Sequence, residues 1–220
     1  MIRLNSDSMN NRSKKQLNQI IQEMDSKNPC ERAEAIKRLG QMNLLIKDLP
    51  VIIHSKLEEA LFDPVAEVRC ETVMALAFLE GKIAIPIIEP LLDDPELSVR
   101  SNTIAALSFI GITSQIITKK MMNFLNAPEP EFRDRCARAC GRLKIIQAKK
   151  MLLELARTDS SPAVRTGAVV GLGLLEDGDP QLKMELRQML SAETSSPVIS
   201  AIHETLTLIK IATARDNLQL

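Results

Sequence analysis

A repeated unit of 31 to 37 residues constrains the fold of this chain more than any other feature of its sequence. Each copy is anchored by an arginine that follows a Pro-containing turn, as in the stretch DPELSVRSNTIAAL. The anchors are Arg32, Arg69, Arg100, Arg133 and Arg165, which lie 37, 31, 33 and 32 residues apart. Five copies with one spacing predict stacked repeats, each of which buries its apolar face against its neighbours.

Apolar residues recur four, seven and ten positions after each anchor, which places them on one face of a helix. The Pro before each anchor falls in the turn or first helical turn, where a missing N–H costs little. Each anchor therefore begins the second helix of its copy. A sixth, degraded copy without the arginine is expected at Pro197 and Ser200.

An amphipathic segment precedes each anchor and is expected to form the first helix of the copy. These segments are Lys14–Asp25, Lys47–Phe62, Lys82–Leu92, Ser114–Leu125, Gln147–Arg157 and Pro180–Leu190. The prediction is an all-α chain of about twelve helices in six pairs. Residues 13–212 are expected to form one α-α solenoid, with a flexible N-terminal tail over 1–12 and a C-terminal tail over 213–220.

The composition favours helix and excludes several function classes. The chain has no Trp, no Tyr and five Phe, and its 28 basic residues balance 28 acidic ones. A net charge of zero draws the chain neither to nucleic acid nor to a membrane surface. The first residues resemble no signal peptide and no stretch is long enough to span a bilayer, so we expect a cytoplasmic protein. The four cysteines fit free thiols better than a disulfide framework.

The anchoring arginines are predicted to form an Asp–Arg ladder that fixes the register of the repeats. An arginine on the buried face needs a partner, because an unpaired buried cation costs several kcal/mol. An Asp in the turn, six residues before an anchor, can supply a bidentate carboxylate to the same or the adjacent copy. Where Ser26 or Ala127 replaces this Asp, backbone carbonyls are expected to accept more of the hydrogen bonds from the anchoring arginine. The predicted ladder comprises Asp63, Arg69, Asp94, Arg100, Asp159, Arg165, Arg133 and Arg32.

The pattern in DPVAEVRCETVMAL and DPELSVRSNTIAAL resembles HEAT repeats, most closely the short bacterial type of phycobilin-lyase-like proteins. The resemblance covers about residues 14–212. It implies an α-α superhelix of the HEAT/ARM type. For function it implies a range of classes: scaffolds, adaptors, chromophore lyase subunits, phycobilisome-degradation factors and a few enzymes.

The second helices are predicted to line a groove with the residues two, five and nine positions after each anchor. Met74, Phe78 and Phe109 would form an apolar strip there, and Arg135, Arg138 and Arg142 a cationic centre. Asn102, Ala105, Val170 and Leu174 occupy equivalent positions, as do Ile202, Thr205 and Ile209 if Ser200 anchors the last copy. The alternative is that the face is rotated by one position and that Phe78 and Phe109 belong to the core.

Arg133 to Lys150 contains seven basic residues against one acid, Asp134. This is either a solvated face or a patch for an acidic partner. Nucleic acid is disfavoured, since no aromatic residues interleave for base stacking.

Little in the sequence indicates catalysis, and no catalytic residue, metal or cofactor is expected. His54 and His203 are too few for a zinc site. Cys136 and Cys140 lie four residues apart on one helix, where Cys140 takes a core position. The glycines of GAVVGLG lie within a repeat helix and are interpreted as close helix packing or local flexibility rather than as a phosphate-binding loop.

The leading hypothesis is a non-catalytic scaffold or adaptor that binds an acidic and apolar partner segment in the groove. The resemblance implies an alternative, a bilin lyase subunit or phycobilisome-related factor, although no Tyr or Trp is present to stack on a bilin. A HEAT-like nucleic-acid-binding protein is a third hypothesis. The apolar last copy also suggests a homodimer through that end, or a C-terminal tail that folds over it.

Overall fold

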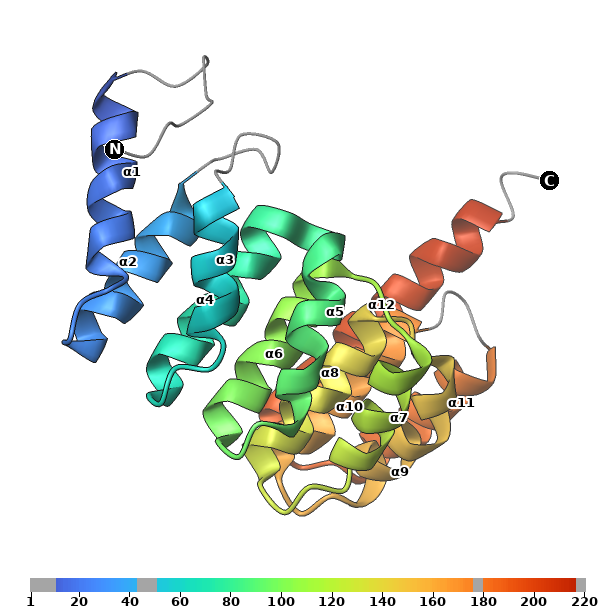
Figure 1. Ribbon diagram of the computed structural model, residues 1–220. Helices are drawn as coiled ribbons and strands as arrows, with labels where there is room; N and C mark the ends of the chain where they lie inside the picture. The colour runs from blue at the N-terminus through green and yellow to red at the C-terminus, as the bar shows by residue number, and fades with distance from the viewer. Residues whose placement is uncertain (1–10, 43–50, 176–179, 217–220) are drawn as a thin grey trace. The chain divides into compact units, whose positions relative to one another are not determined.

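The computed structural model describes residues 11–42, 51–175 and 180–216, and within them every regular element is helical (Figure 1). The all-α prediction is confirmed. The chain divides into two compact units, Met1–Ile110 (unit 1) and Gly111–Leu220 (unit 2). Of the predicted tails, residues 1–10 and 217–220 lie outside the described residues, whereas residues 11–12 and 213–216 belong to helices. The single solenoid over 13–212 stays a prediction.

Unit 1 alternates first and second helices, and its second helices α2, α4 and α6 follow one another side by side (Figure 1). Its elements are α1 (Asn11–Glu23), α2 (Pro29–Gln41), α3 (Val51–Ala60), α4 (Ala66–Glu80), η2 (Gly81–Ala84), α5 (Ile85–Ile88), η3 (Glu89–Asp93) and α6 (Leu97–Ile110). Helix α2 illustrates how the turn starts a second helix. The Asn28 side chain accepts a hydrogen bond from the Cys30 N–H, and Pro29 takes the first helical position.

The segment Lys82–Leu92 is not the single helix that its amphipathic pattern predicts. It forms two 3₁₀ turns, η2 and η3, on either side of the short helix α5. Pro86 and Pro90 lie at the starts of α5 and η3. A proline cannot donate to the preceding turn, so the two prolines divide the segment into short pieces.

Unit 2 repeats the same alternation with the second helices α8, α10 and α12. Its elements are α7 (Gln115–Phe124), α8 (Pro130–Arg142), η4 (Ile146–Ala148), α9 (Lys149–Thr158), α10 (Pro162–Leu175), α11 (Pro180–Ala192) and α12 (Ser196–Asp216). Helix α10 packs against both α8 and α12. Within the described residues, no helix is long and apolar enough to cross a membrane.

The predicted core positions are buried in both units. The residues four and seven positions after every arginine anchor are buried, including Cys140. At the tenth position Leu79, Leu143 and Leu175 are buried, whereas Met42 and Ile110 are half-buried.

The sixth copy is real, but its predicted register is wrong by one residue. Its anchor is Ile199 rather than Ser200, because Ile199 lies three residues after the start of its helix, as Arg165 does. Leu206 and Ile209 are buried seven and ten positions further on, whereas His203, four positions on, is exposed. Ile202, Thr205 and Ile209, predicted to face the groove, are therefore core residues. Much of the apolar surface that suggested a homodimer through this end is thus buried within the unit.

Close packing of α10 explains the glycines of GAVVGLG. A Cβ atom on Gly171 would lie 2.4 Å from the Ala137 carbonyl oxygen of α8, and one on Gly141 would lie 2.5 Å from the Gly171 carbonyl oxygen. On the other side of α10, a Cβ on Gly173 would meet Thr205 of α12 at 2.7 Å. Of the two interpretations of these glycines, close helix packing is confirmed.

Candidate functional site

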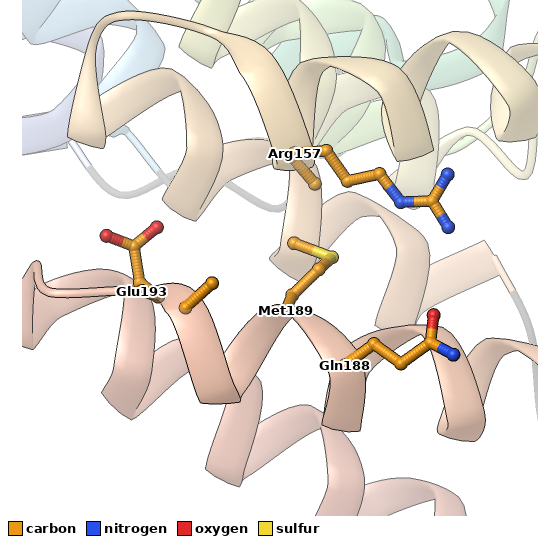
Figure 2. A pocket seen from close by; sticks show the side chains of 6 residues that line it. Arg157, Gln188, Met189 and Glu193 are labelled. Atoms are coloured by element: carbon orange, nitrogen blue, oxygen red, sulfur yellow. The ribbon is translucent and has the colours of Figure 1, made fainter.

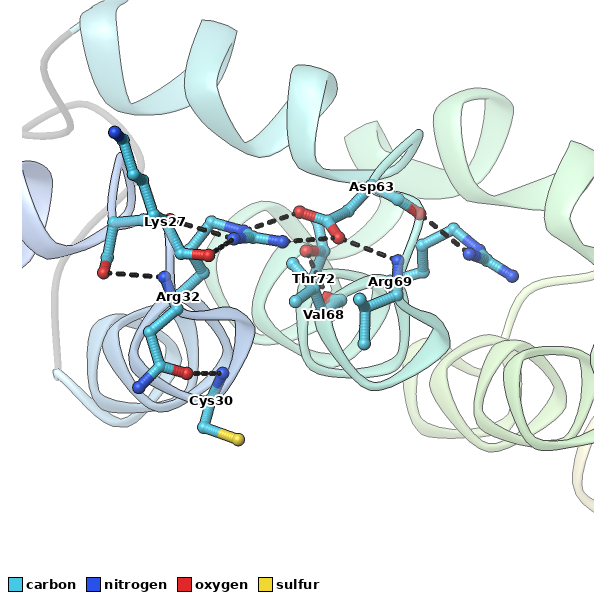
Figure 3. Close-up of polar contacts among 10 residues, drawn as sticks. Lys27, Cys30, Arg32, Asp63, Val68, Arg69 and Thr72 are labelled. Atoms are coloured by element: carbon cyan, nitrogen blue, oxygen red, sulfur yellow. Dashed lines mark hydrogen bonds and ion pairs between the residues drawn. The ribbon is translucent and has the colours of Figure 1, made fainter.

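The Asp–Arg ladder links four of the five anchors to the turn of the following copy. The fifth, Arg100, donates to the Asp94 and Pro95 carbonyl oxygens of its own turn, and the following turn has Ala127 in place of an Asp. In unit 1, Arg32 donates from Nε and Nη2 to the Asp63 carboxylate at 2.8 and 2.9 Å. Arg69 binds Asp94 in the same bidentate manner, with both distances 2.8 Å. Figure 3 shows Asp63 between the two arginines, where its carboxylate binds Arg32 and its backbone carbonyl accepts from Arg69 at 2.8 Å. One turn residue therefore joins two successive second helices.

The ladder carboxylates are held in their charged form. Burial alone would raise the pKa of Asp63, but hydrogen bonds from Arg32 and the Val65 N–H, with the charges of Arg32 and Arg69, hold that pKa below its usual value. The pKa of Asp94 is lowered in the same way by Arg69 and the Glu96 N–H. These carboxylates are charged structural partners and lack the raised pKa of a general acid.

In unit 2 the ladder ends on a residue that the sequence pattern did not reveal. Arg133 binds Asp159 at 2.9 and 3.0 Å, as in unit 1. Arg165 instead makes its bidentate pair with Glu193, at 2.8 Å for both bonds. The pKa of Glu193 falls to about 2, chiefly through the Arg165 hydrogen bonds. Glu193 lies six residues before Ile199, so the correct anchor of the last copy would have pointed to it.

The expectation that carbonyls compensate for a missing Asp is wrong. Every anchor donates to the backbone carbonyl six residues earlier, whichever side chain is present there. The acceptors are the carbonyl oxygens of Ser26, Asp63, Asp94, Ala127 and Asp159, at 2.8–2.9 Å. The carboxylates that the structure shows in these turns bind the arginine of the preceding copy.

Phe78 and Phe109 lie on the surface of unit 1. Their side chains are 49% and 61% exposed, and their rings meet edge to face with centroids 4.9 Å apart. The alternative that placed them in the core is therefore wrong. Met74, one turn before Phe78, is half-buried, as is Asn102, whose side chain donates to the Ser98 carbonyl. We call Met74, Phe78 and Phe109 the Phe face.

A pocket of about 210 Å³ lies beside the Phe face, between α2 and α4. Gly40 lets the helices approach closely, since a Cβ there would lie 3.0 Å from the Ala75 Cα atom. The lining residues are Lys37, Gly40, Gln41, Glu71, Met74, Ala75 and Phe78. Apolar side chains of α4 thus meet a polar rim. This volume is below the range of typical small-molecule sites and suits a single side chain.

The three arginines of α8 that were predicted to bind a partner differ in exposure and pairing. Arg135 and Arg142 are exposed, whereas Arg138 is half-buried and donates to Asp134 at 2.9 Å. We call these three residues the Arg face. Leu174 of α10 is half-buried, and its carbonyl accepts a hydrogen bond from Lys144. With the corrected register, the last copy presents Glu204 and Leu208, both exposed, in place of Ile202, Thr205 and Ile209.

A second pocket, of about 300 Å³, lies between the first helices α9 and α11 of unit 2 (Figure 2). Its lining comprises Ala156, Arg157, Gln188, Met189, Ala192 and Glu193. Its charged side chains already have partners, because Arg157 pairs with Glu185 and Glu193 with Arg165. The pocket therefore offers a ligand mainly the Met189 side chain and the Gln188 amide.

The thiols of Cys136 and Cys140 and the imidazole of His54 are held by burial or by ion pairs rather than arranged for catalysis. Cys136 and Cys140 are fully buried, and burial raises the pKa of Cys140 to about 12, so neither thiol is a nucleophile at neutral pH. His54 contacts the buried Glu80 at 2.6 Å and Glu58 at 3.3 Å, and the Glu80 hydrogen bond raises its pKa. No cluster of three metal-ligating side chains is found within the described residues.

Three solved structures show what this fold is similar to. YibA of Escherichia coli has a TM-score of 0.65 and 21% identity, over 90% of this chain and 71% of its own. A designed armadillo repeat protein in complex with the peptide (KR)4 has a TM-score of 0.59 and 20% identity, over 88% of this chain and 99% of its own. An engineered protein has a TM-score of 0.61 and 17% identity, over 93% of this chain and 98% of its own. At these identities the likeness shows the fold.

The model of the HEAT repeats family matches residues 118–207. No curated protein sequence matches the chain. The CpcE–CpcF complex of phycocyanin lyase from Nostoc sp. PCC7120 has a TM-score of 0.45 and 14% identity, over 95% of this chain and 98% of its own, which is too low to support an argument about bilins. Residues 118–207 thus match HEAT repeats, and the chain has the all-α repeat fold of HEAT and ARM proteins.

Proposed function

We propose that this protein is a non-catalytic scaffold that binds a partner protein through the exposed sides of its second helices. The observation that carries the proposal is the Phe78–Phe109 pair. Two of the five phenylalanines of the chain meet on the surface of unit 1, beside a pocket of side-chain size. Exposed aromatic residues next to such a pocket are typical of the anchor sites of protein interfaces.

The Arg face of unit 2 supports the same proposal with a different chemistry. Arg135 and Arg142 are exposed, and neither forms an ion pair with another described residue. Arginine presents a planar fork that binds carboxylates bidentately, so this face suits acidic side chains of a partner. Each face is proposed as a contact surface of its own unit.

The two alternative functions, a bilin lyase subunit and a nucleic-acid-binding protein, have no particular residues that support them. A bilin lyase subunit stays a hypothesis from the resemblance, and the chain has no Tyr or Trp to stack on a tetrapyrrole. A nucleic-acid-binding role is disfavoured by the zero net charge. The designed armadillo protein is in complex with a basic peptide, so its likeness supports segment binding by the fold rather than a particular partner for the Arg face.

Charge reversal of the Arg face is expected to weaken partner binding without unfolding the chain. The variant is Arg135→Glu with Arg142→Glu; Arg138 is retained because a Glu there would face Asp134. Recovery of the partner by affinity capture from the native host, followed by mass spectrometry, should fall about tenfold, since reversal replaces attraction with repulsion at two positions.

The matched control is Lys119→Glu with Arg187→Glu, which makes the same charge change at exposed positions on the first helices α7 and α11. Its recovered partners should equal those of the unchanged protein. Equal loss in both variants, or no loss in either, would remove the Arg face from the proposal. Circular dichroism of both variants checks that the helices are retained.

A further inference from the structure

We propose that the pocket beside the Phe face receives an apolar side chain of a partner segment that carries a lysine or arginine next to it. This inference rests on the proposed function and specifies the partner chemistry for unit 1. The cation would pair with Glu71 on the pocket rim, and the apolar side chain would lie between Met74 and Phe78.

The shape of the pocket favours one apolar side chain. Its base is formed where Gly40 of α2 crosses Ala75 of α4, and Met74 and Phe78 supply its apolar wall. Phe109 supports that wall, because its ring meets the Phe78 ring at 4.9 Å and an interplanar angle of 81°. An edge-to-face pair fixes both rings before a ligand arrives, which reduces the entropy that binding would cost.

The charge of the rim favours a cation. Glu71 is half-buried, and among the described residues it has no hydrogen bond or ion pair of its own. Burial raises the pKa of Glu71; Lys37 opposes this shift, while the charges of Glu67 and Glu34 add to it. The lining itself holds one carboxylate, Glu71, and one cation, Lys37, while Glu67 and Glu34 lie outside it and add repulsion at Glu71. A partner cation beside Glu71 would therefore relieve both that repulsion and the burial of its carboxylate.

The two faces therefore differ in the charge that they select. The Arg face suits acidic side chains, and the rim of the unit 1 pocket suits a basic one. A partner that met both faces would carry charges of both signs, together with an apolar anchor for the pocket. Sequence reasoning missed this difference because it treated the second helices as one groove.

The probes that test the proposal are two synthetic, fluorescently labelled, alanine-based helical peptides. Both carry two leucines four residues apart; one has lysines at the neighbouring positions of the same face, and its twin has glutamates there. Titration with the full chain, followed by fluorescence anisotropy, should show that the lysine peptide binds about tenfold more tightly than its glutamate twin. Added salt should narrow that difference.

Two substitutions separate the apolar anchor from the charge. Glu71→Gln should reduce the preference for the lysine peptide to about threefold or less. Phe109→Ala should weaken both peptides about tenfold, because it removes the support of Phe78. Glu59→Gln on α3 and Phe62→Ala, whose side chain is 83% exposed in the turn after α3, are the matched controls and should change neither affinity.

Three results would overturn the proposal: equal or tighter binding of the glutamate twin, a preference that Glu71→Gln leaves intact, or no binding of the lysine peptide. A free chain that sediments as a dimer, dissociates on Phe109→Ala and is not competed by the peptide would assign the pocket to a second copy instead. If the Arg-face variant still loses its partner while the peptides fail, the scaffold function stands and this inference alone falls.

Discussion

Replacing Arg69 with Met is expected to lower the free energy of unfolding by about 3–4 kcal/mol. The side chains of Arg69 and Asp94 are only 11% and 7% exposed, so the substitution leaves a nearly buried carboxylate without its bidentate partner. It also leaves the Asp63 carbonyl oxygen without the donor that joins it to α4. Urea denaturation followed by circular dichroism measures the loss.

The double variant Arg69→Met with Asp94→Leu distinguishes the cost of an unpaired buried carboxylate from the cost of lost side-chain packing. Because the second substitution removes the unpaired carboxylate, it should recover about half or more of the lost stability. Arg187→Met, at an exposed position of α11, is the control and should change stability by less than about 0.5 kcal/mol. A loss below about 1 kcal/mol for Arg69→Met would show that the ladder contributes little to stability.

A single methyl group added at Gly171 is expected to destabilise unit 2 by about 2–3 kcal/mol. In most helices Gly→Ala stabilises by about 0.5–1 kcal/mol, so the expected sign is reversed. The reason is geometric: the new Cβ would lie 2.4 Å from the Ala137 carbonyl oxygen, which is a backbone atom that no rotamer change can move. Helices α8 and α10 would have to separate.

Gly173→Ala provides the comparison on the same helix. Its Cβ would meet the Thr205 Cγ2 atom at 2.7 Å, and a side chain can adjust more easily than a backbone. Thermal unfolding should therefore show a smaller fall in the midpoint for Gly173→Ala than for Gly171→Ala. A stabilised Gly171→Ala protein would contradict the close approach of α8 and α10.

The repeat pattern predicted the fold because local spacing alone determines which side of a helix is apolar. Leu76 and Leu107 could be assigned to the core from their distance to the anchor, and both are fully buried. The partner of each arginine could not be assigned, since the choice between the same and the next turn depends on how helices pack. Glu193 was missed because the last copy lacks both the Arg and the Asp of the motif.

The candidate surface was predicted only in part. Positions nine residues after an anchor lie opposite the core, so Phe78 and Phe109 were candidates, but their exposure was open until the helices were placed. Arg138 could not be distinguished from Arg135 and Arg142 without its pair to Asp134. The pocket between α2 and α4 depends on the approach of Gly40 to Ala75, a distance between helices that spacing within a helix does not encode.

The most direct test of the scaffold proposal is a photo-cross-linking comparison in the native host. A photoreactive phenylalanine analogue replaces either Phe109 on the Phe face or Phe62 in the turn after α3, and both positions are more than half exposed. The account predicts a specific protein adduct from position 109 and little or none from position 62. Equal adduct yields at the two positions, or no protein adduct at position 109, would contradict it.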